Sequence, residues 1–367
     1  MIRNDAEKPP EDESVIVKKS TKTLMNVLST SVLLSLSSLS AAELVNHAAM
    51  PSEATLSWSS EDVTKLMNSD TTDSGEAPTP QATTTITTTI RKSNGVVNPT
   101  PSTSQTIQIL DTNHYSNQPS VSARAALVMD AQTGEVLYSK NTNTAMPIAS
   151  LTKLMTAVVT SDAKLNMSEK ITLQQGDFSC SGCKSSSSTL RVGDTMNRAE
   201  ALLFALMKSE NPAASALART YPGGRSAFYA AMNKKARELG MNSTHYIEST
   251  GLHPGNVSSA RDLGILVSAA SQYGLIRQFS TTASYDFNLG YRVLKSNNTN
   301  ALVRNGGWNI NLSKTGFINE AGRCVAMHTT LNNRPAVVIL LGASTSQSRT
   351  NDAIRLMNWA SQLPKRV

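Results

Sequence analysis

The sequence is poor in cysteine, in aromatic residues and in charge. Its 367 residues include three cysteines, and only 5% are aromatic, 17% charged and 39% hydrophobic. Three cysteines are too few for a disulfide-dense scaffold and one short of a four-cysteine zinc site. Because the hydrophobic and charged fractions are low for a chain that folds throughout, part of this chain is expected to build no core.

Several catalytic signatures are also missing. The chain contains no G-x-S-x-G nucleophile elbow and no H-E-x-x-H motif. Without them, a Ser-His-Asp hydrolase of the elbow type and a zinc peptidase of the H-E-x-x-H type are both disfavoured. His245, His253 and His328 are scattered along the chain, so we interpret them as surface or structural histidines rather than as metal ligands. The sequence predicts no metal site.

The net charge of +7 is unevenly distributed. Residues 1–42 are neutral, residues 43–120 carry −5, and residues 121–367 hold 26 Lys and Arg against 14 Asp and Glu, a net charge of +12. A basic domain behind an acidic tether is attracted to polyanions such as nucleic acid, anionic lipid or cell-wall polymer. The basic residues are dispersed and the chain begins with a secretion signal, so we predict no nucleic-acid partner.

The first 120 residues read as targeting and tether sequence. Lys18, Lys19 and Lys22 precede the apolar run 24–39 and the small residues 40–42, so residues 1–42 are predicted to be a signal peptide with an extended leading region, and the protein to be periplasmic. The run is short and diluted with Ser and Thr, which disfavours a transmembrane helix. About a third of residues 43–120 are Ser or Thr, which predicts a disordered linker.

Residues 121–367 carry the patterns of a folded α/β domain. We expect a hairpin over 125–130 and 135–139, core-facing helices over 150–160, 198–207 and 226–239, strands over 324–330 and 336–341 joined by a turn at 332–333, and a last helix over 351–362. Strands at both ends with helices between them imply one antiparallel sheet, packed by helices, that combines both termini of the domain.

The cysteines support two different expectations. Cys180 and Cys183 form a C-x-x-C in a serine-rich loop, where they are either disulfide-bonded or two free thiols, and the sequence leaves both open. Cys324 lies in an apolar run, so we expect it to be a buried core residue.

A serine and a lysine three residues apart mark the predicted start of the helix 150–160. In Ser150-Leu151-Thr152-Lys153 the Ser150 hydroxyl and the Lys153 amine fall on one helical face. Lysine can take the serine proton only if burial or nearby positive charge lowers its pKa, and the N–H groups of a helix start can hold a developing negative charge. Taken alone, the pattern also suits a capping serine beside a solvated lysine.

Two further short motifs follow in the chain. Ser209-Glu210-Asn211 lies in the break between two predicted helices, where a hydroxyl can relay a proton and a carboxamide can bind a peptide carbonyl, although an ordinary interhelical turn ending at Pro212 explains it equally well. Lys314-Thr315-Gly316 lies in a strand-like context. There the glycine permits close approach of another backbone, and the lysine and threonine can bind a carboxylate.

The order and spacing of the three motifs carry more information than any one of them. S-x-x-K, then S-x-N, then K-T-G, in helix-start, loop and strand settings, is the signature of the serine penicillin-recognising enzymes. Longer segments of the chain resemble the D-alanyl-D-alanine endopeptidases among the low-molecular-weight penicillin-binding proteins. These segments are PIASLTKLMTAVV (147–159), SENPAASALARTYPGG (209–224), STGLHPGNVSSARDL (249–263) and WNINLSKTGFINEAGRCVAM (308–327).

The resemblance implies a fold, a chemistry and a set of roles. The fold would be that of serine β-lactamases and DD-peptidases, with an inserted helical subdomain, and residues 121–367 would form the catalytic domain. Ser150 would be the nucleophile, Lys153 its base and Ser209 a proton shuttle, while Asn211 would bind the substrate backbone. Lys314 with Thr315 would hold the substrate carboxylate, Gly316 would be a further substrate-binding residue, and the N–H groups of Ser150 and Phe317 would form the oxyanion hole.

The same resemblance implies partners and a reaction. It implies peptidoglycan peptides as substrates, beta-lactam antibiotics as covalent inhibitors, loose membrane or wall association and no cofactor. Only 51 residues follow Gly316, which we interpret as the absence of a carboxypeptidase's second domain and anchor, and this favours an endopeptidase that cuts D-alanyl-diaminopimelate cross-links. A carboxypeptidase and a non-catalytic wall-binding module remain the alternatives. A β-lactamase is disfavoured because no E-x-x-L-N element lies between Asn211 and Lys314.

Two segments depart from the family pattern. Pro212 follows the S-x-N motif where an arginine is expected, and residues 179–188 (SCSGCKSSSS) look unlike the relatives. Both departures concern the rim of the expected cleft and so the substrate preference.

Overall fold

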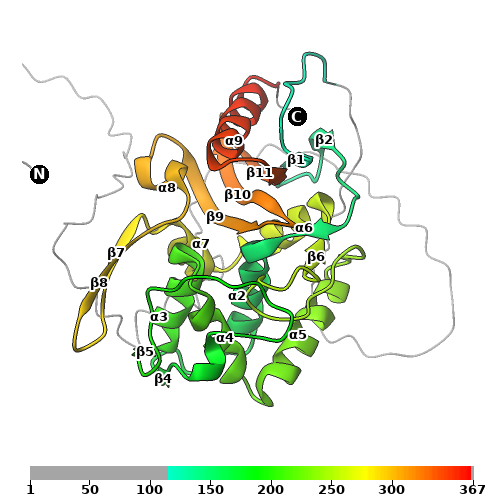
Figure 1. Ribbon diagram of the computed structural model, residues 1–367. Helices are drawn as coiled ribbons and strands as arrows, with labels where there is room; N and C mark the ends of the chain where they lie inside the picture. The colour runs from blue at the N-terminus through cyan, green and yellow to red at the C-terminus, as the bar shows by residue number, and fades with distance from the viewer. Residues whose placement is uncertain (1–114, 365–367) are drawn as a thin grey trace, which may run out of the picture. The chain divides into compact units, whose positions relative to one another are not determined.

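The structure, a computed structural model, describes residues 115–364 (Figure 1). The predicted signal peptide and most of the predicted linker lie outside the described residues, and the division of the chain at residues 42 and 120 stays a prediction. The ring of Tyr115 packs edge-on against Trp359, and the Ser120 carbonyl accepts a hydrogen bond from Arg355. Residues just ahead of Val121 therefore contact the domain.

A five-stranded antiparallel sheet lies at the centre of the fold (Figure 1). Its strand order β2-β1-β11-β10-β9 combines the first and last strands of the described chain, as the sequence predicts. The turn between β10 and β11 is formed by Asn332 and Asn333, both at left-handed φ angles that asparagine tolerates. The strands are β1 (Ala125–Asp130), β2 (Val136–Lys140), β9 (Asn309–Ile318), β10 (Gly322–Leu331) and β11 (Arg334–Ala343).

Strand β1 is apolar on both faces because the sheet is covered on both sides. Successive side chains alternate between the faces of a strand. Leu127 and Met129 join the larger core, on the side covered by α6 (Ala260–Ala270), whereas Ala126 and Val128 pack beneath α9 (Ser346–Ser361) (Figure 1).

The predicted helices form with shifted boundaries. The helix expected over 150–160 is α2 (Thr152–Asp162), and the one over 226–239 is α5 (Gly224–Glu238), ended by Gly240 at positive φ. The helix expected over 198–207 divides into α3 (Arg198–Leu203) and the π-helical turn η3 (Phe204–Lys208). The last helix, α9, begins earlier than expected because the Thr345 side chain caps it by accepting from the Ser348 N–H.

Helix α4 (Asn211–Arg219) is the helix expected after the S-x-N motif. Several other elements were not predicted, and most of them are short or exposed. None of the helices among residues 115–364 is long and apolar enough to cross a lipid bilayer. The remaining elements are β3 (Met146–Pro147), β6 (Val257–Ser258), β4 (Lys170–Thr172), η2 (Gln175–Asp177), β5 (Thr195–Asn197), α7 (Gly274–Thr281), β7 (Ser284–Asn288), β8 (Val293–Asn297) and α8 (Ala301–Asn305).

The structure decides the state of the three cysteines. A disulfide joins Cys180 and Cys183 in the loop before β5. Cys324 is completely buried in β10, as predicted, and burial raises the pKa of its thiol to about 11.

Candidate active site

The predicted nucleophile lies on a tight turn. Ser150 is the middle residue of the 3-10 helix η1 (Ala149–Leu151), one turn earlier than the α-helix α2, so it sits just before a helix start rather than on it. Ala149 has a φ of 49°, a left-handed conformation that non-glycine residues rarely adopt.

Two glycines from distant segments press against this turn. A Cβ atom on Gly316 would lie 3.0 Å from the Ser150 nitrogen, and one on Gly251 would lie 1.9 Å from the Ala149 carbonyl oxygen. The close approach at Gly316 confirms the reason given for a glycine in this strand. This role of Gly251 was not predicted from the sequence, although Gly251 lies in one of the segments that resemble the endopeptidases (249–263).

Lys153 is completely buried and its ammonium nitrogen has three partners. Its Nζ lies 3.0 Å from Ser150 Oγ, 2.6 Å from Asn211 Oδ1 and 2.6 Å from the Thr250 carbonyl oxygen. Burial lowers the pKa of Lys153 to about 7, and the nearby carboxylates of Glu248 and Glu210 oppose that shift. The amine is therefore neutral in a large fraction of molecules near neutral pH.

The hydrogen bonds of Lys153 point its lone pair at the serine. A carbonyl oxygen and an amide oxygen can only accept, so Thr250 and Asn211 take the two hydrogens of the neutral amine. The remaining lone pair then faces the Ser150 hydroxyl, which can donate its proton. The carbonyl of Thr250 was missed, because a backbone group leaves no motif in a sequence.

The second motif connects the first to the third. Ser209 adopts a φ of 66° after η3, and Lys314 Nζ donates to its hydroxyl at 2.9 Å. Asn211 begins α4, and its side-chain amide also donates to Ser186 Oγ at 2.9 Å. Pro212 occupies the first turn of α4, where a missing N–H costs no helical hydrogen bond.

The third motif lies on β9. Lys314 is only 1% exposed, and burial, with smaller contributions from the charges of Lys153 and Arg349, holds its pKa well below the usual value for lysine. Thr315 is buried and its hydroxyl bonds Thr299 Oγ1 at 2.7 Å. The Phe317 side chain is 43% exposed, with the Arg323 guanidinium over its ring.

Glu210, the middle residue of the S-x-N motif, was missed. Its buried carboxylate accepts hydrogen bonds from Ser188 Oγ at 2.5 Å and Thr189 Oγ1 at 2.6 Å. These bonds attach the serine-rich loop, which departs from the family pattern, to the motif.

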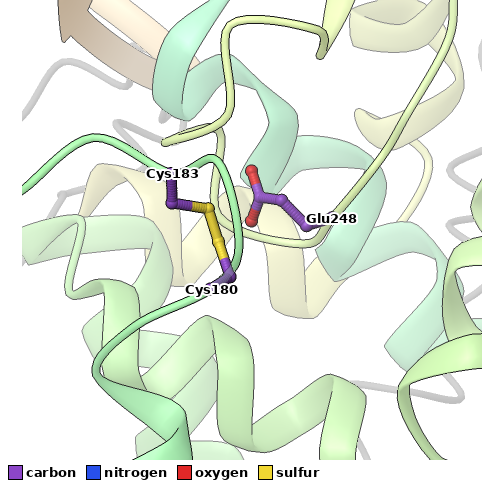
Figure 2. Close-up of side chains that lie close together, drawn as sticks. All are labelled: Cys180, Cys183 and Glu248. Atoms are coloured by element: carbon purple, nitrogen blue, oxygen red, sulfur yellow. A yellow bond between two sulfur atoms is a disulfide. The ribbon is translucent and has the colours of Figure 1, made fainter.

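The disulfide lies beside a buried carboxylate (Figure 2). The Cys180 and Cys183 sulfurs and a Glu248 oxygen lie within 4.8 Å of one another, a spacing that suits a metal ion. Sulfurs that are bonded to each other offer no thiolate, and the Glu248 oxygens accept backbone N–H groups at 2.5 and 2.6 Å. The cluster of Cys180, Cys183 and Glu248 is therefore a contact between two loops.

A cavity of about 290 Å³ lies beside these groups, and Asn211, Glu248 and Thr250 line part of it.

The predicted side chains form two hydrogen-bonded groups, Ser150 with Lys153 and Asn211, and Ser209 with Lys314, which the S-x-N motif joins along the chain. A serine hydroxyl facing a buried, neutral amine is the arrangement that nucleophilic acyl transfer requires. The individual roles of these side chains, and of Thr315, Gly316 and Phe317, are still predictions.

Known proteins match about two thirds of this chain. The model of the D-alanyl-D-alanine carboxypeptidase family matches residues 112–345. A D-alanyl-D-alanine endopeptidase from Pseudomonas aeruginosa is 46% identical over 249 residues, which cover 66% of this chain and 78% of the relative. One from Escherichia coli is 44% identical over 247 residues, which cover 66% of this chain and 79% of that relative.

Solved structures agree with the sequence matches. The Streptomyces K15 DD-transpeptidase superposes with a TM-score of 0.62 at 29% identity, covering 67% of this chain and all of that one. A D-alanyl-D-alanine carboxypeptidase from Mycobacterium tuberculosis H37Rv superposes with a TM-score of 0.63 at 25% identity, covering 70% and 98%. The expected DD-peptidase fold is confirmed, and the chain belongs to the D-alanyl-D-alanine carboxypeptidase family of serine peptidases.

Proposed function

We propose that this protein is a DD-endopeptidase that hydrolyses D-alanyl-diaminopimelate cross-links in peptidoglycan through an acyl-serine intermediate at Ser150. The observation that carries the chemistry is the set of contacts of the buried Lys153 Nζ, which meets the acceptors Asn211 Oδ1 and the Thr250 carbonyl and faces the Ser150 hydroxyl. The choice of an endopeptidase rests on the two relatives of that name, at 46% and 44% identity.

Acylation begins at the serine. Ser150 Oγ attacks the D-alanine carbonyl carbon as its proton passes to Lys153, and the carbonyl oxygen becomes an oxyanion. The Ser150 N–H, beside which β9 passes at Gly316, and the Phe317 N–H stabilise that charge. The intermediate collapses when the leaving amine receives a proton by way of Ser209, which leaves an ester at Ser150. Water then hydrolyses the ester and releases the shortened peptide.

The substrate carboxylate lies beside the leaving amine. In the cross-link, the carbon that bears the amine of diaminopimelate also bears a carboxylate, and terminal D-alanine has the same arrangement. Lys314 and Thr315 lie on β9 beside Ser209 and supply an amine and a hydroxyl that can bind this group. Asn211 binds a carbonyl of the acyl-donor peptide.

A DD-carboxypeptidase is the second candidate. Relatives named D-alanyl-D-alanine carboxypeptidase match at 32% identity in Bacillus subtilis and 29% in Escherichia coli, and this chain spans 62% of the length of each. Because the site would accept either leaving group, only product analysis separates the two reactions. A wall-binding module without turnover is the third candidate.

We further propose that the protein acts in the periplasm and that beta-lactam antibiotics acylate Ser150. The apolar run 24–39 behind its lysines supports secretion, and the likeness of the site to that of penicillin-recognising enzymes supports acylation. The net charge of +12 over residues 121–367 favours loose association with the acidic cell wall.

One experiment tests the reaction and the nucleophile together. The protein is incubated with a fluorescent penicillin, and the adduct is located by intact mass and peptide mapping. In parallel, the unlabelled protein is incubated with purified cross-linked muropeptide dimers, and the products are separated by chromatography. We expect an adduct on Ser150 and conversion of dimers to monomers.

The matched control is Ser150→Ala, which removes only the nucleophile. It is expected to lose the adduct and the turnover while still sedimenting with purified cell wall. Loss of terminal D-alanine with dimers left intact would make the protein a carboxypeptidase. Equal labelling of the variant would reject Ser150, and cell-wall binding without any adduct would favour the binding module.

A further inference from the structure

Glu248 is a buried carboxylate that none of the three motifs contains. It is 3% exposed and lies in the turn before β6. Its oxygens accept the backbone N–H of Thr250 at 2.5 Å and of Gly251 at 2.6 Å. The Asn256 side chain bonds both the carboxylate, at 3.2 Å, and the Glu248 carbonyl, at 2.8 Å. The Glu248 carboxylate therefore hydrogen-bonds to several residues of the turn 248–256 and holds that turn together.

This turn contacts the catalytic groups on two sides. The Thr250 carbonyl receives the Lys153 hydrogen bond at 2.6 Å, and Gly251 lies against the Ala149 carbonyl of the nucleophile turn. The two N–H groups that donate to the Glu248 carboxylate thus belong to Thr250, which contacts the base, and to Gly251, which contacts the nucleophile turn. A shift of the carboxylate would move both contacts.

The disulfide loop covers Glu248 from the other side (Figure 2). The Lys184 N–H bonds the Leu252 carbonyl at 3.0 Å, and the Cys180–Cys183 bridge lies against the carboxylate. Glu248 is almost fully buried under this loop, so fixed N–H donors surround much of its carboxylate.

We propose that Glu248 is a positioning residue, which holds the Thr250 carbonyl against the Lys153 amine and so keeps the lone pair of the base directed at Ser150. The proposal rests on the proposed function only in that Lys153 is the base. It assigns the carboxylate no contact with substrate.

Glu248 also acts on Lys153 through its charge. The charged groups around Lys153 are Glu248 from the turn, Glu210 from the S-x-N loop and Lys314 from β9. A carboxylate favours the ammonium form, so removal of Glu248 lowers the pKa of Lys153 still further. Loss of the cover alone would let water in, which stabilises the ammonium and raises that pKa. The direction of the shift therefore separates charge from structural damage.

The test measures the second-order rate of acylation by a fluorescent penicillin between pH 5 and 9 in the wild-type protein, in Glu248→Gln and in Glu248→Asp. For Glu248→Gln we expect a plateau about 10-fold to 100-fold lower, because a misdirected base loses alignment with the hydroxyl. The acidic limb of its profile is expected to move to lower pH. Glu248→Asp keeps the charge but cannot reach both N–H groups, so its plateau falls while its acidic limb stays in place.

Asp177→Asn is the matched control. Asp177 is another buried carboxylate in the wall of the same cavity, and it pairs with Arg219 and Arg225. This variant is expected to lower the melting temperature without moving the acidic limb.

The inference is overturned if both Glu248 variants reproduce the wild-type profile, or if the limb of Glu248→Gln stays in place or moves to higher pH. If Glu248→Gln does not fold, Glu248→Asp decides alone, and an unchanged plateau overturns the proposal. Absence of an adduct in the wild-type protein would instead reject the proposed function.

Discussion

Two buried lysines dominate the site at the scale of single residues. Burial lowers the pKa of both Lys153 and Lys314, but their hydrogen bonds differ. Lys153 meets two pure acceptors and one hydroxyl, whereas Lys314 donates to Ser209 Oγ and to the Thr315 carbonyl, each at 2.9 Å. This difference suits Lys153 to take a proton from Ser150, and leaves Lys314 beside Ser209, the proposed proton shuttle, where it can bind the substrate carboxylate.

The pKa of Lys153 predicts the pH dependence of acylation. With a pKa of about 7, the amine is a base only in its neutral form, so the acylation rate should rise about tenfold per pH unit below pH 7 and level off above it. Stopped-flow labelling with a fluorescent penicillin measures this profile. A rate that stays constant between pH 5 and 8 would contradict the role given to Lys153.

The same pKa predicts how stability depends on pH. The pKa of Lys153 falls from 10.5 in the unfolded chain to about 7 in the folded one, so the unfolded state binds the extra proton between these values. Stability contributed by the neutral amine is present above pH 10.5 and is lost as pH falls toward 7. Relative to Lys153→Met, the unfolding free energy of the wild-type protein should rise by about 3 to 4 kcal/mol from pH 7 to pH 10.

Urea denaturation of both proteins at each pH measures this difference, and groups common to the two cancel. An equal change with pH in both proteins would show that the folded state does not depress the pKa of Lys153.

At the scale of elements, the site is a place where separate chain segments press together. The 3-10 turn η1 carries Ser150, the turn before β6 reaches it at Gly251, and β9 passes it at Gly316. Each approach works because a glycine has no Cβ, so the backbones come closer than other residues allow. The elements therefore set the shape of the nucleophile turn together.

Gly251→Ala should disrupt this contact far more than its backbone angle alone predicts. Gly251 and Gly307 share a φ of 85°, so alanine at either position costs about 1 kcal/mol of conformational strain. At Gly251 the new Cβ would also lie 1.9 Å from a backbone oxygen, whereas nothing lies within 4 Å at Gly307. We expect Gly307→Ala to retain acylation and Gly251→Ala to lose at least about 90% of it, because the nucleophile turn must shift.

Labelling with fluorescent penicillin, normalised to the folded fraction from circular dichroism, gives both values. Equal acylation of the two variants would show that the turn accommodates the extra methyl group.

At the scale of the whole described domain, the central sheet joins the two ends of the sequence. β1 lies beside β11, and α9 covers both from one side. The buried Asp352 of α9 accepts hydrogen bonds from the N–H and the hydroxyl of Ser122 and from the N–H of Ala123, at 2.7 to 2.9 Å. The last helix thereby holds the start of the domain in place.

Asp352→Ala should destabilise the domain without changing its chemistry. The substitution leaves three donors unpaired, and we expect the free energy of unfolding to fall by about 3 kcal/mol. The acylation rate per folded molecule should stay at the wild-type value. The reason is that α9 packs on one face of the sheet, whereas α6 and the nucleophile turn pack on the opposite face. Asn358→Ala, at an exposed position of the same helix, is the control and should change stability by less than about 0.5 kcal/mol. Similar stability losses in the two variants would contradict the argument.

The sequence determined the chemistry and the outline of the fold. Ser150 and Lys153 are close because residues three apart share one helical face, a local rule that the observed 3.0 Å contact follows. The short apolar run of β1 and the turn signals at Asn332 and Asn333 likewise predicted strands, since apolar runs and turn chemistry are local properties of the chain.

Only the tertiary structure decided how the base is aimed and what surrounds it. Lys153 meets the Thr250 carbonyl across 97 residues of sequence, and Lys314 meets Ser209 across 105. Neither the left-handed conformation of Ala149 nor the role of Glu248 has a pattern of its own, because each depends on backbone groups brought in from distant segments. Side-chain periodicity records which face of an element is buried, and contact between two elements exists only once the chain has folded.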